Sequence, residues 1–153
     1  MKLTRAGEYG VRCVLYLAKQ DKERLVSRKE IAAKTDVPPP FLAKIAQQLA
    51  KAGIIEIQQG ATGGYRLLLS PAKITLLAVI EAIIGEISLN TCVTRPGACK
   101  ASAGCTVHRV WNKARSQLRA TLQEADFATL AREDSCCLSP FPCNPNQIKG
   151  EKI

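Results

Sequence analysis

The sequence predicts a mainly α-helical protein with a small β-hairpin, built as a winged helix-turn-helix plus a long dimerisation helix. Two short helices joined by a tight turn are expected within residues 27–53, which is the pattern of a helix-turn-helix. Two β-rich runs around the glycine-rich turn "GATGG" come directly after it, and a hairpin in this position is the wing of a winged helix. From about Thr106 to Asp126 an apolar stripe recurs at helical spacing, which predicts the long helix.

The charge of the chain indicates a polyanionic partner. The 153 residues carry 22 lysines and arginines against 13 acidic residues, a formal net charge of +9. Most of this excess lies in residues 1–70. A balance this basic suits nucleic acid or a membrane surface. No stretch of about 20 apolar residues could span a bilayer, and the start lacks the apolar core of a secretory signal. We therefore expect a cytoplasmic protein without a membrane partner, whose cysteines stay reduced.

The elements of the predicted DNA-binding domain are indicated by capping and turn residues. The first helix is expected to start at Thr4, which can act as N-cap. Ser27 followed by Glu30 forms a capping box, which starts a short helix. The prolines after "TDV" open a second helix, because first-turn N–H groups need no partner, and Gly53 ends it as a C-cap. With the hairpin, these helices make residues 1–70 the predicted winged helix-turn-helix domain.

The second helix of this domain and the tip of the wing form the predicted DNA-contacting surface. In a winged helix, the second helix enters the major groove and the wing reaches the backbone or the minor groove. Glycines let the backbone approach phosphates closely, and polar side chains can reach groove edges. A winged helix that binds protein instead is the alternative, and the basic charge of the domain argues against it. The predicted contacts are Arg5, Ser27, Arg28, Pro39, Pro40, Lys44, Gln47, Gln59, Gly60, Thr62, Gly63 and Arg66.

The second half of the chain divides into three predicted segments before the tail. Residues 71–90 include an apolar helix that connects the winged helix to the next segment, residues 91–106, which form a cysteine-containing loop. Residues 107–130 are the predicted dimerisation helix. An apolar stripe of this length on an arm-like helix needs a partner helix, and a second copy of the chain is the simplest partner. Packing within one chain is the alternative.

The last segment, residues 131–153, is rich in proline, asparagine and charge, which predicts a mobile tail. Its prolines hold the chain extended, and the spacing of its cysteines is not a recognised ligand spacing. The tail cysteines, which we interpret as non-ligands, are Cys136, Cys137 and Cys143.

The cysteine loop gathers the chain's softest ligands. Six residues separate Cys92 from Cys99, five separate Cys99 from Cys105, and two separate Cys105 from His108, the only histidine. Structural zinc sites usually show paired C-x-x-C knuckles, which are absent here. Longer gaps can wrap an iron–sulfur cluster, in which a histidine or a carboxylate sometimes replaces one thiolate. The glycines of the loop allow it to turn around such a group.

Four motifs together resemble the family of iron–sulfur winged-helix regulators to which IscR and NsrR belong. They are "MKLTRAGEYGVR", "VPPPFLAKIAQQLAKAGII", "GATGGYRL" and the cysteine loop, in this order. The resemblance covers residues 1 to about 130. It implies a homodimer that binds operator DNA, with the recognition helix at residues 38–52 and the wing at residues 59–66.

The resemblance also implies the cluster ligands. It assigns Cys92, Cys99 and Cys105 as three of them. In the IscR type a histidine at the position of His108 completes a [2Fe–2S] site. In the NsrR type a carboxylate of the other subunit, near the position of Glu8, completes a [4Fe–4S] site. We favour His108 with [2Fe–2S], and Glu8 with [4Fe–4S] is the competing assignment. Each of the two residues also has an alternative role that involves no cluster. His108 would then be a solvated residue at the start of a helix, and Glu8 would pair with an arginine.

The expected function is that of a homodimeric DNA-binding transcriptional regulator, acting as a repressor. It would sense cluster status, redox state or nitric oxide through a bound cluster. A clusterless regulator of the same fold, sensing by thiol and disulfide or by zinc, is the alternative. An enzyme with a small-molecule substrate is not expected, because no nucleophile–base pair, phosphate loop or cofactor fingerprint accompanies the cysteines.

Overall fold

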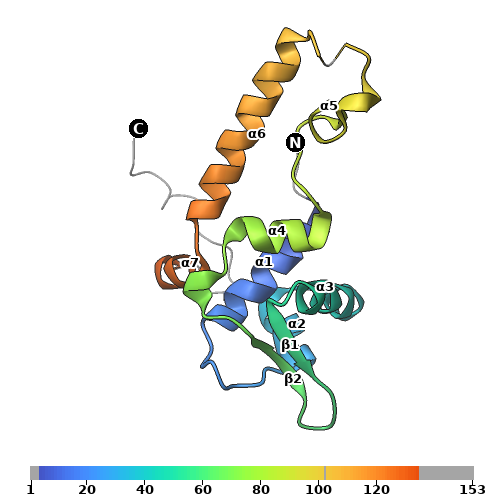
Figure 1. Ribbon diagram of the computed structural model, residues 1–153. Coiled ribbons are helices and arrows are strands. Elements are labelled where there is room, and N and C mark those ends of the chain that lie inside the picture. Colours follow the sequence, from blue (N-terminus) through green and yellow to red (C-terminus); the bar gives the residue numbers. More distant parts are fainter. Residues whose placement is uncertain (1–3, 102, 135–153) are drawn as a thin grey trace.

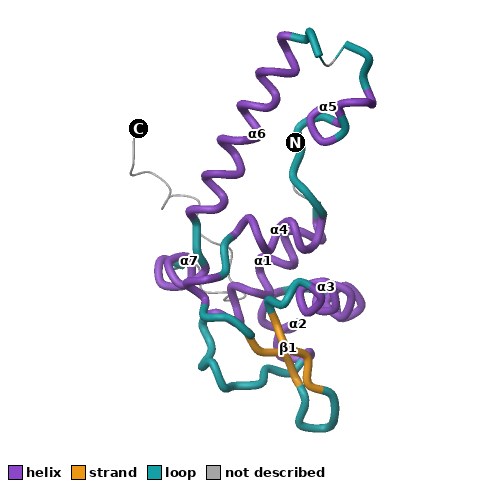
Figure 2. The backbone as a smooth tube through the Cα atoms, viewed as in Figure 1, coloured by secondary structure: helices purple, strands orange, loops and turns teal. Residues whose placement is uncertain are grey.

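The computed structural model describes residues 4–101 and 103–134, and it confirms the predicted mainly α-helical class with a small hairpin. The winged helix sits at one end, and a long helical arm projects from it (Figure 1). Figure 2 shows that the strands of the described residues are confined to the hairpin. The elements are α1 (Arg5–Ala18), α2 (Arg28–Thr35), α3 (Pro39–Lys51), β1 (Ile55–Gln58), β2 (Gly64–Leu67), η1 (Pro71–Lys73), α4 (Leu76–Ile84), α5 (Thr91–Thr94), η2 (Pro96–Ala98), α6 (Thr106–Glu124) and α7 (Phe127–Glu133).

Helix α1 is the centre of the core. The Oγ1 of Thr4 accepts a hydrogen bond from the backbone N–H of Gly7 at 3.2 Å, so the predicted N-cap is confirmed. The helix packs against α2, α3, α4 and α7. A Cβ on Gly10 would lie 2.8 Å from Cγ1 of Ile83, so the absence of a side chain lets α1 and α4 approach closely. The two helices thereby join the winged helix to the connecting segment.

The helix-turn-helix forms where the sequence predicts it. The backbone N–H of Glu30 donates to the Ser27 Oγ at 3.1 Å, which is half of the predicted capping box. The other half differs, because the Glu30 carboxylate accepts hydrogen bonds from Arg24 and from the Tyr16 hydroxyl instead. Asp36 ends α2 with a φ of 54°, in the left-handed region that aspartate tolerates. This turn sets α3 across α2.

The wing is a two-stranded antiparallel hairpin. Ile55 pairs with Leu67 and Gln58 with Gly64. A third segment pairs with β2 near the loop end of the hairpin, because Val26 and Tyr65 exchange two backbone hydrogen bonds of 2.9 Å. A Cβ on Gly64 would lie 2.6 Å from the Val26 carbonyl oxygen, so this position needs glycine. Strand β2 is therefore held beside Val26 up to the residues that precede it at the loop.

The long helix of the arm forms where the apolar stripe predicts it, from about Thr106 to Asp126, because α6 spans Thr106–Glu124. The predicted dimerisation segment of residues 107–130 differs in its last part, where a second helix, α7, starts at Phe127. The break occurs because Asp126 caps a new helix: its Oδ1 accepts hydrogen bonds from the backbone N–H groups of Ala128 and Thr129, both at 2.9 Å. Helix α7 then packs on α1 and η1.

The segment predicted as a tail also starts later than expected, because α7 runs to Glu133. The tail cysteines Cys136, Cys137 and Cys143 lie outside the described residues. Among the residues that the structure describes, no helix is both long and apolar enough to cross a membrane.

The cap at Asp126 makes a pH-dependent contribution to stability. Hydrogen bonds from Thr129 and the backbone hold the pKa of Asp126 below its ordinary value of 3.8. A carboxyl group whose pKa is lower in the folded than in the unfolded state stabilises the fold above the unfolded value. This contribution is lost as pH falls from that value through the folded one. We expect chemical denaturation of Asp126→Asn to show a smaller loss of stability between pH 5 and about pH 2 than the parent chain. Equal pH dependence in both would contradict this role of the cap.

Candidate cluster site and DNA interface

The cysteine loop lies at the far end of the arm, away from the winged helix (Figure 1). It is built from α5, η2 and the start of α6, and α5 packs beside α6. The Oδ1 of Asn90 accepts a hydrogen bond from the backbone N–H of Thr91 at 2.9 Å and starts α5. At the other end of the loop, Cys105 is the N-cap of α6. Each end of the loop is therefore fixed to a helix.

Three of the predicted ligands come together at the start of α6. The Nδ1 of His108 lies 3.5 Å from the Sγ of Cys92. The backbone N–H of His108 donates to the Sγ of Cys105 at 3.4 Å, so this thiol replaces the usual hydroxyl of an N-cap. All three side chains are half-buried.

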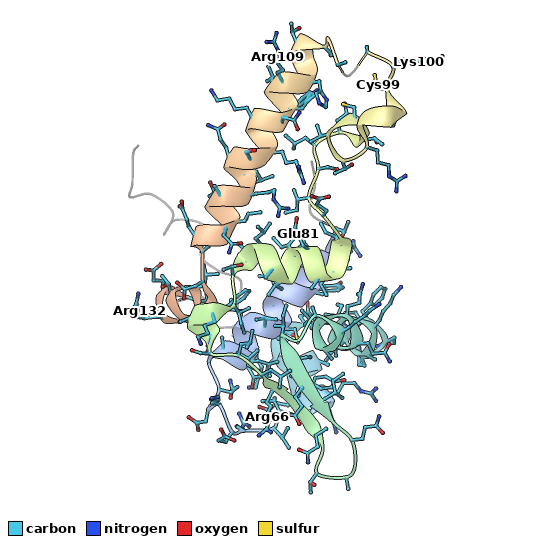
Figure 3. All side chains as sticks on the ribbon, in the orientation of Figure 1. Arg66, Glu81, Cys99, Lys100, Arg109 and Arg132 are labelled. Atoms are coloured by element: carbon cyan, nitrogen blue, oxygen red, sulfur yellow. The ribbon has the colours of Figure 1, made fainter. Side chains whose placement is uncertain are left out.

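Cys99 is the one of the four candidate ligands in and beside the loop that is exposed. It lies in the loop beyond η2, where Figure 3 shows it next to Lys100. Within residues 4–101 and 103–134, no three side chains of the types His, Cys, Asp and Glu are arranged to hold a metal ion. The donors present do fit an iron–sulfur cluster in kind, because thiolates with one imidazole are among its known ligands. The contacts among these donors run from the ring of His108 to Cys92 and from the backbone N–H of His108 to Cys105.

Glu8, the competing ligand, lies on a different part of the molecule. It is exposed in the first turn of α1, and the described part of the chain shows no ion pair to it. The predicted pairing with an arginine is absent among these residues. Arg12 lies over the ring of Tyr9 at 6.0 Å and donates to the Thr35 carbonyl oxygen at 3.4 Å instead. Glu8 as a ligand from a second copy therefore stays a prediction.

Cys13 does not belong to the site. It is fully buried in the core, and burial raises the pKa of its thiol to about 12. A thiol with such a pKa stays protonated at neutral pH and is a poor metal ligand. This separates it from the half-buried Cys92 and Cys105.

A set of polar contacts joins the arm to the winged helix. The Glu81 carboxylate on α4 pairs with Arg119 on α6 and accepts a hydrogen bond from the backbone N–H of Ile87 at 2.9 Å. Arg115 donates to the Ile87 carbonyl oxygen at 3.0 Å and pairs with Glu86. Figure 3 shows Glu81 on the face of α4 toward the arm. We call these residues the arm link. No local pattern indicates the arginine contacts, because their partners lie 28, 29 and 38 positions away in the chain.

The predicted DNA-contacting residues of α3 lie on its exposed face. Leu42, Ile45, Ala46 and Leu49 are buried. The opposite face is exposed, and the predicted contacts on it are Pro39, Pro40, Lys44 and Gln47. Around the turn, an open groove between α2 and α3 is lined by Arg28, a predicted contact, and by Lys29, which was not predicted as one.

The tip of the wing exposes polar residues and glycines, and the starts of α1 and α2 expose further predicted DNA contacts. Gln59, Gly60 and Thr62 are exposed at the tip, where Gly60 has a φ of 115° that only glycine adopts readily. Gly63 is half-buried, and a Cβ on it would lie 2.2 Å from the Gln58 carbonyl oxygen. The exposed residues at the starts of α1 and α2 are Arg5, Ser27 and Arg28.

Arg66 is less free than the other predicted contacts. Its Nε donates to Glu56 at 2.8 Å, and its Nη1 lies 3.2 Å from a carboxylate oxygen of Glu23. Two carboxylates therefore neutralise much of its charge, and it braces the base of the wing. These ion pairs hold the Arg66 side chain against the hairpin, and its contact with DNA stays a prediction.

A family model described as an iron-dependent transcriptional regulator matches residues 3–133. The chain belongs to the Rrf2 family. It is a DNA-binding transcriptional regulator, and members of this family are regulators and not enzymes. The predicted resemblance to the family of IscR and NsrR is thus confirmed.

Individual relatives cover most of the chain. The regulator NsrR of Geobacillus kaustophilus is 35% identical over 132 residues, which cover 86% of this chain and 88% of that protein. Among solved structures, IscR of T. potens superposes with a TM-score of 0.66 at 27% identity and covers 86% of this chain and 87% of its own. CymR, the global cysteine regulator of B. subtilis, superposes with a TM-score of 0.68 at 26% identity, over 86% of this chain and 97% of its own.

Proposed function

We propose that this Rrf2-family regulator is a homodimeric repressor whose DNA affinity depends on an iron–sulfur cluster held by Cys92, Cys99, Cys105 and His108. The observation that carries the proposal is the convergence of His108 with Cys92 and Cys105 at the start of α6. A [2Fe–2S] cluster with one imidazole ligand suits this donor set. Cys99 would complete it by closing the exposed loop onto the other three.

The chemistry that a bound cluster supplies is reversible oxidation, reaction with nitric oxide, and loss when iron is scarce. The residues of the chain do the rest. Cys92 on α5 and Cys105 at the start of α6 would be tied to one another, which fixes the two ends of the loop. Because Arg119 of α6 pairs with Glu81 of α4 in the arm link, a shift of α6 would move α4 and, with it, the winged helix. A coupling of about 1–3 kcal/mol between the loop and DNA binding is enough for a switch.

Homodimerisation is supported by the surface of α6. No residue of this 19-residue helix is buried in the single chain. Val107, Val110 and Trp111 are exposed by 54%, 62% and 37%. A second copy would cover this stripe and hold two recognition helices at a fixed spacing, as two half-sites of an operator require. The partner of α6 is thus proposed to be the α6 of a second copy.

A charge in this stripe tests the dimer. We expect Val110→Glu to convert the protein from dimer to monomer, because a carboxylate would have to be buried without a partner. Sedimentation at matched concentrations measures this. The control is Lys113→Glu, a change of charge at another exposed position of α6 that lies off the stripe. A Val110→Glu protein that sediments as the parent does would contradict this interface.

A second prediction concerns the exposed face of α3 and its binding to DNA. We expect Lys44→Ala to weaken binding to operator fragments selected from random duplex DNA by the parent protein. One lost phosphate contact should also reduce the slope of log K against log salt concentration by about 1. The control is Lys73→Ala, at an exposed lysine of η1, away from α3. Unchanged affinity and slope in Lys44→Ala would remove this residue from the interface.

Counting iron and sulfide on protein purified without oxygen tests the cluster and its fourth ligand. We expect a coloured protein with thiolate-to-iron absorbance, a changed spectrum in His108→Ala, and an unchanged one in Glu8→Ala. The reverse pattern would support the competing [4Fe–4S] site with Glu8 of a second copy. A colourless protein that holds zinc or forms a disulfide would overturn the proposal that the protein binds a cluster.

A clusterless regulator is the second candidate. It is favoured by the exposure of Cys99, which makes this thiol accessible to oxidants. The similarity to CymR, a cysteine regulator, is compatible with it. In that case Cys99 and a second thiol would be oxidised, and mass spectrometry after mild oxidation would find a disulfide that Cys99→Ala lacks.

A further inference from the structure

His108 has a polar neighbour that the proposed ligand set does not use. Asn112 lies one helical turn after it on α6, so the two side chains share a face of the helix. The Nδ2 of Asn112 lies 2.8 Å from the Nε2 of His108. On the other side of the ring, Nδ1 lies 3.5 Å from the Sγ of Cys92. Both ring nitrogens therefore have a defined neighbour, and both side chains are half-buried.

We propose that Asn112 is the positioning residue of His108: it holds the imidazole so that Nδ1, and not Nε2, faces Cys92 and the cluster. This inference rests on the proposed function, because it concerns the same ligand. It adds which nitrogen binds and what holds the ring.

The chemistry of imidazole supports this role. A neutral ring carries hydrogen on one nitrogen and a lone pair on the other. With the Asn112 amide donating to Nε2, the hydrogen sits on Nδ1 and points at the Cys92 sulfur. Ligation through Nδ1 requires the opposite tautomer, in which Nε2–H donates to an acceptor. A half-turn of the amide presents its Oδ1 for this purpose. Asn112 can therefore hold the ring in the same orientation with or without a cluster.

The chemical type of the group behind His108 also affects how firmly its imidazole would bind a cluster. A carboxylate behind a ligating histidine makes the imidazole more basic and strengthens its bond to metal. The neutral Asn112 would not do so, and His108 would then bind a cluster less firmly than a histidine backed by a carboxylate. Placing a carboxylate there should lower the reduction potential, because a more basic ligand stabilises the oxidised iron.

The tautomer of His108 can be measured without any cluster. The chain has a single histidine, so protein labelled with ¹⁵N-histidine gives the signals of one ring. We expect the apoprotein at about pH 8, above the pKa of about 6.5 of free imidazole, to hold mainly the Nδ1–H form. Asn112→Ala should shift it toward the Nε2–H form that free histidine prefers. The control is Gln117→Ala, at an exposed residue of the same helix, and it should match the parent. Identical spectra for the parent and Asn112→Ala would overturn the proposal.

Protein reconstituted with the cluster tests whether Asn112 affects the lifetime and the reduction potential of the cluster. We expect Asn112→Ala to lose its cluster several-fold faster than the parent and than Gln117→Ala. Asn112→Asp should keep the cluster and show a lower reduction potential. If His108→Ala leaves the cluster spectrum unchanged, the proposed ligand fails, whatever the apoprotein shows. If His108→Ala changes the spectrum but neither Asn112 variant changes potential or cluster lifetime, only this inference fails.

Discussion

Replacing Cys105 by serine is expected to abolish the cluster while leaving the fold intact. Serine removes the thiolate that would bind iron, so the absorbance of the protein and its iron content should fall to background. The hydroxyl keeps the N-cap of α6, because serine is a preferred N-cap and can accept the hydrogen bond from the His108 N–H. The thermal midpoint of the apoprotein should therefore not decrease.

The same substitution is expected to fix the protein in one state of DNA binding. Parent protein should bind its operator with affinities that differ by about 5- to 150-fold between the cluster-bound and cluster-free forms, which corresponds to about 1–3 kcal/mol. Cys105→Ser should show the affinity of the cluster-free form under both preparations. Fluorescence anisotropy at one fixed salt concentration measures this, since salt alone changes the affinity.

Cys13→Ala is the matched control for this experiment. It also removes one thiol, but a buried one whose raised pKa makes it a poor ligand. We expect it to keep the cluster and the switch, and to lose about 1 kcal/mol of stability. Full cluster content in Cys105→Ser, or loss of the cluster in Cys13→Ala, would contradict the ligand assignment.

The parts of this fold that could be predicted are those encoded by neighbouring residues. The cap at Ser27, the proline-started α3 and the glycine-rich wing each depend on a few consecutive positions, and each forms where predicted. The candidate cluster ligands are also close together in the chain. The structure brings Cys92 and Cys105 to His108 and leaves Cys99 exposed on the loop.

The parts that the sequence-based prediction missed depend on contacts across the chain. The arm link joins Glu81 to Arg119, and no local pattern pairs these two charges. Asn112 sits at helical spacing from His108, and this was a readable signal, but only the ring geometry shows that the two meet. The end of the long helix near Asp126 was predicted, but the separate helix α7 was missed, because its start depends on the Asp126 cap and on the burial of Phe127 in the core.

Replacing Phe127 by alanine is expected to cost the protein about 3–5 kcal/mol of its free energy of unfolding. Phe127 is among the largest fully buried side chains of the described core, with 0% of its surface exposed. It packs α7 against the core around α1, and its backbone N–H donates to the Ile74 carbonyl oxygen at 3.0 Å. Truncation removes this apolar surface and leaves a cavity that the neighbouring helices can close only in part.

The effect of Phe127→Ala should extend from stability to DNA binding. Helix α7 returns the end of the arm to the winged helix, and Leu76 N–H donates to the Ala125 carbonyl oxygen at 2.8 Å at this junction. A loosened α7 should therefore weaken the coupling between the cluster loop and operator binding. Phe41→Ala is the control for the stability measurement only, because Phe41 lies on the predicted recognition helix. It is the same substitution at a side chain that is 54% exposed and meets Tyr9 edge-on. It should cost only about 1 kcal/mol. Equal losses in urea denaturation of the two variants would show that α7 does not belong to the core of the winged helix.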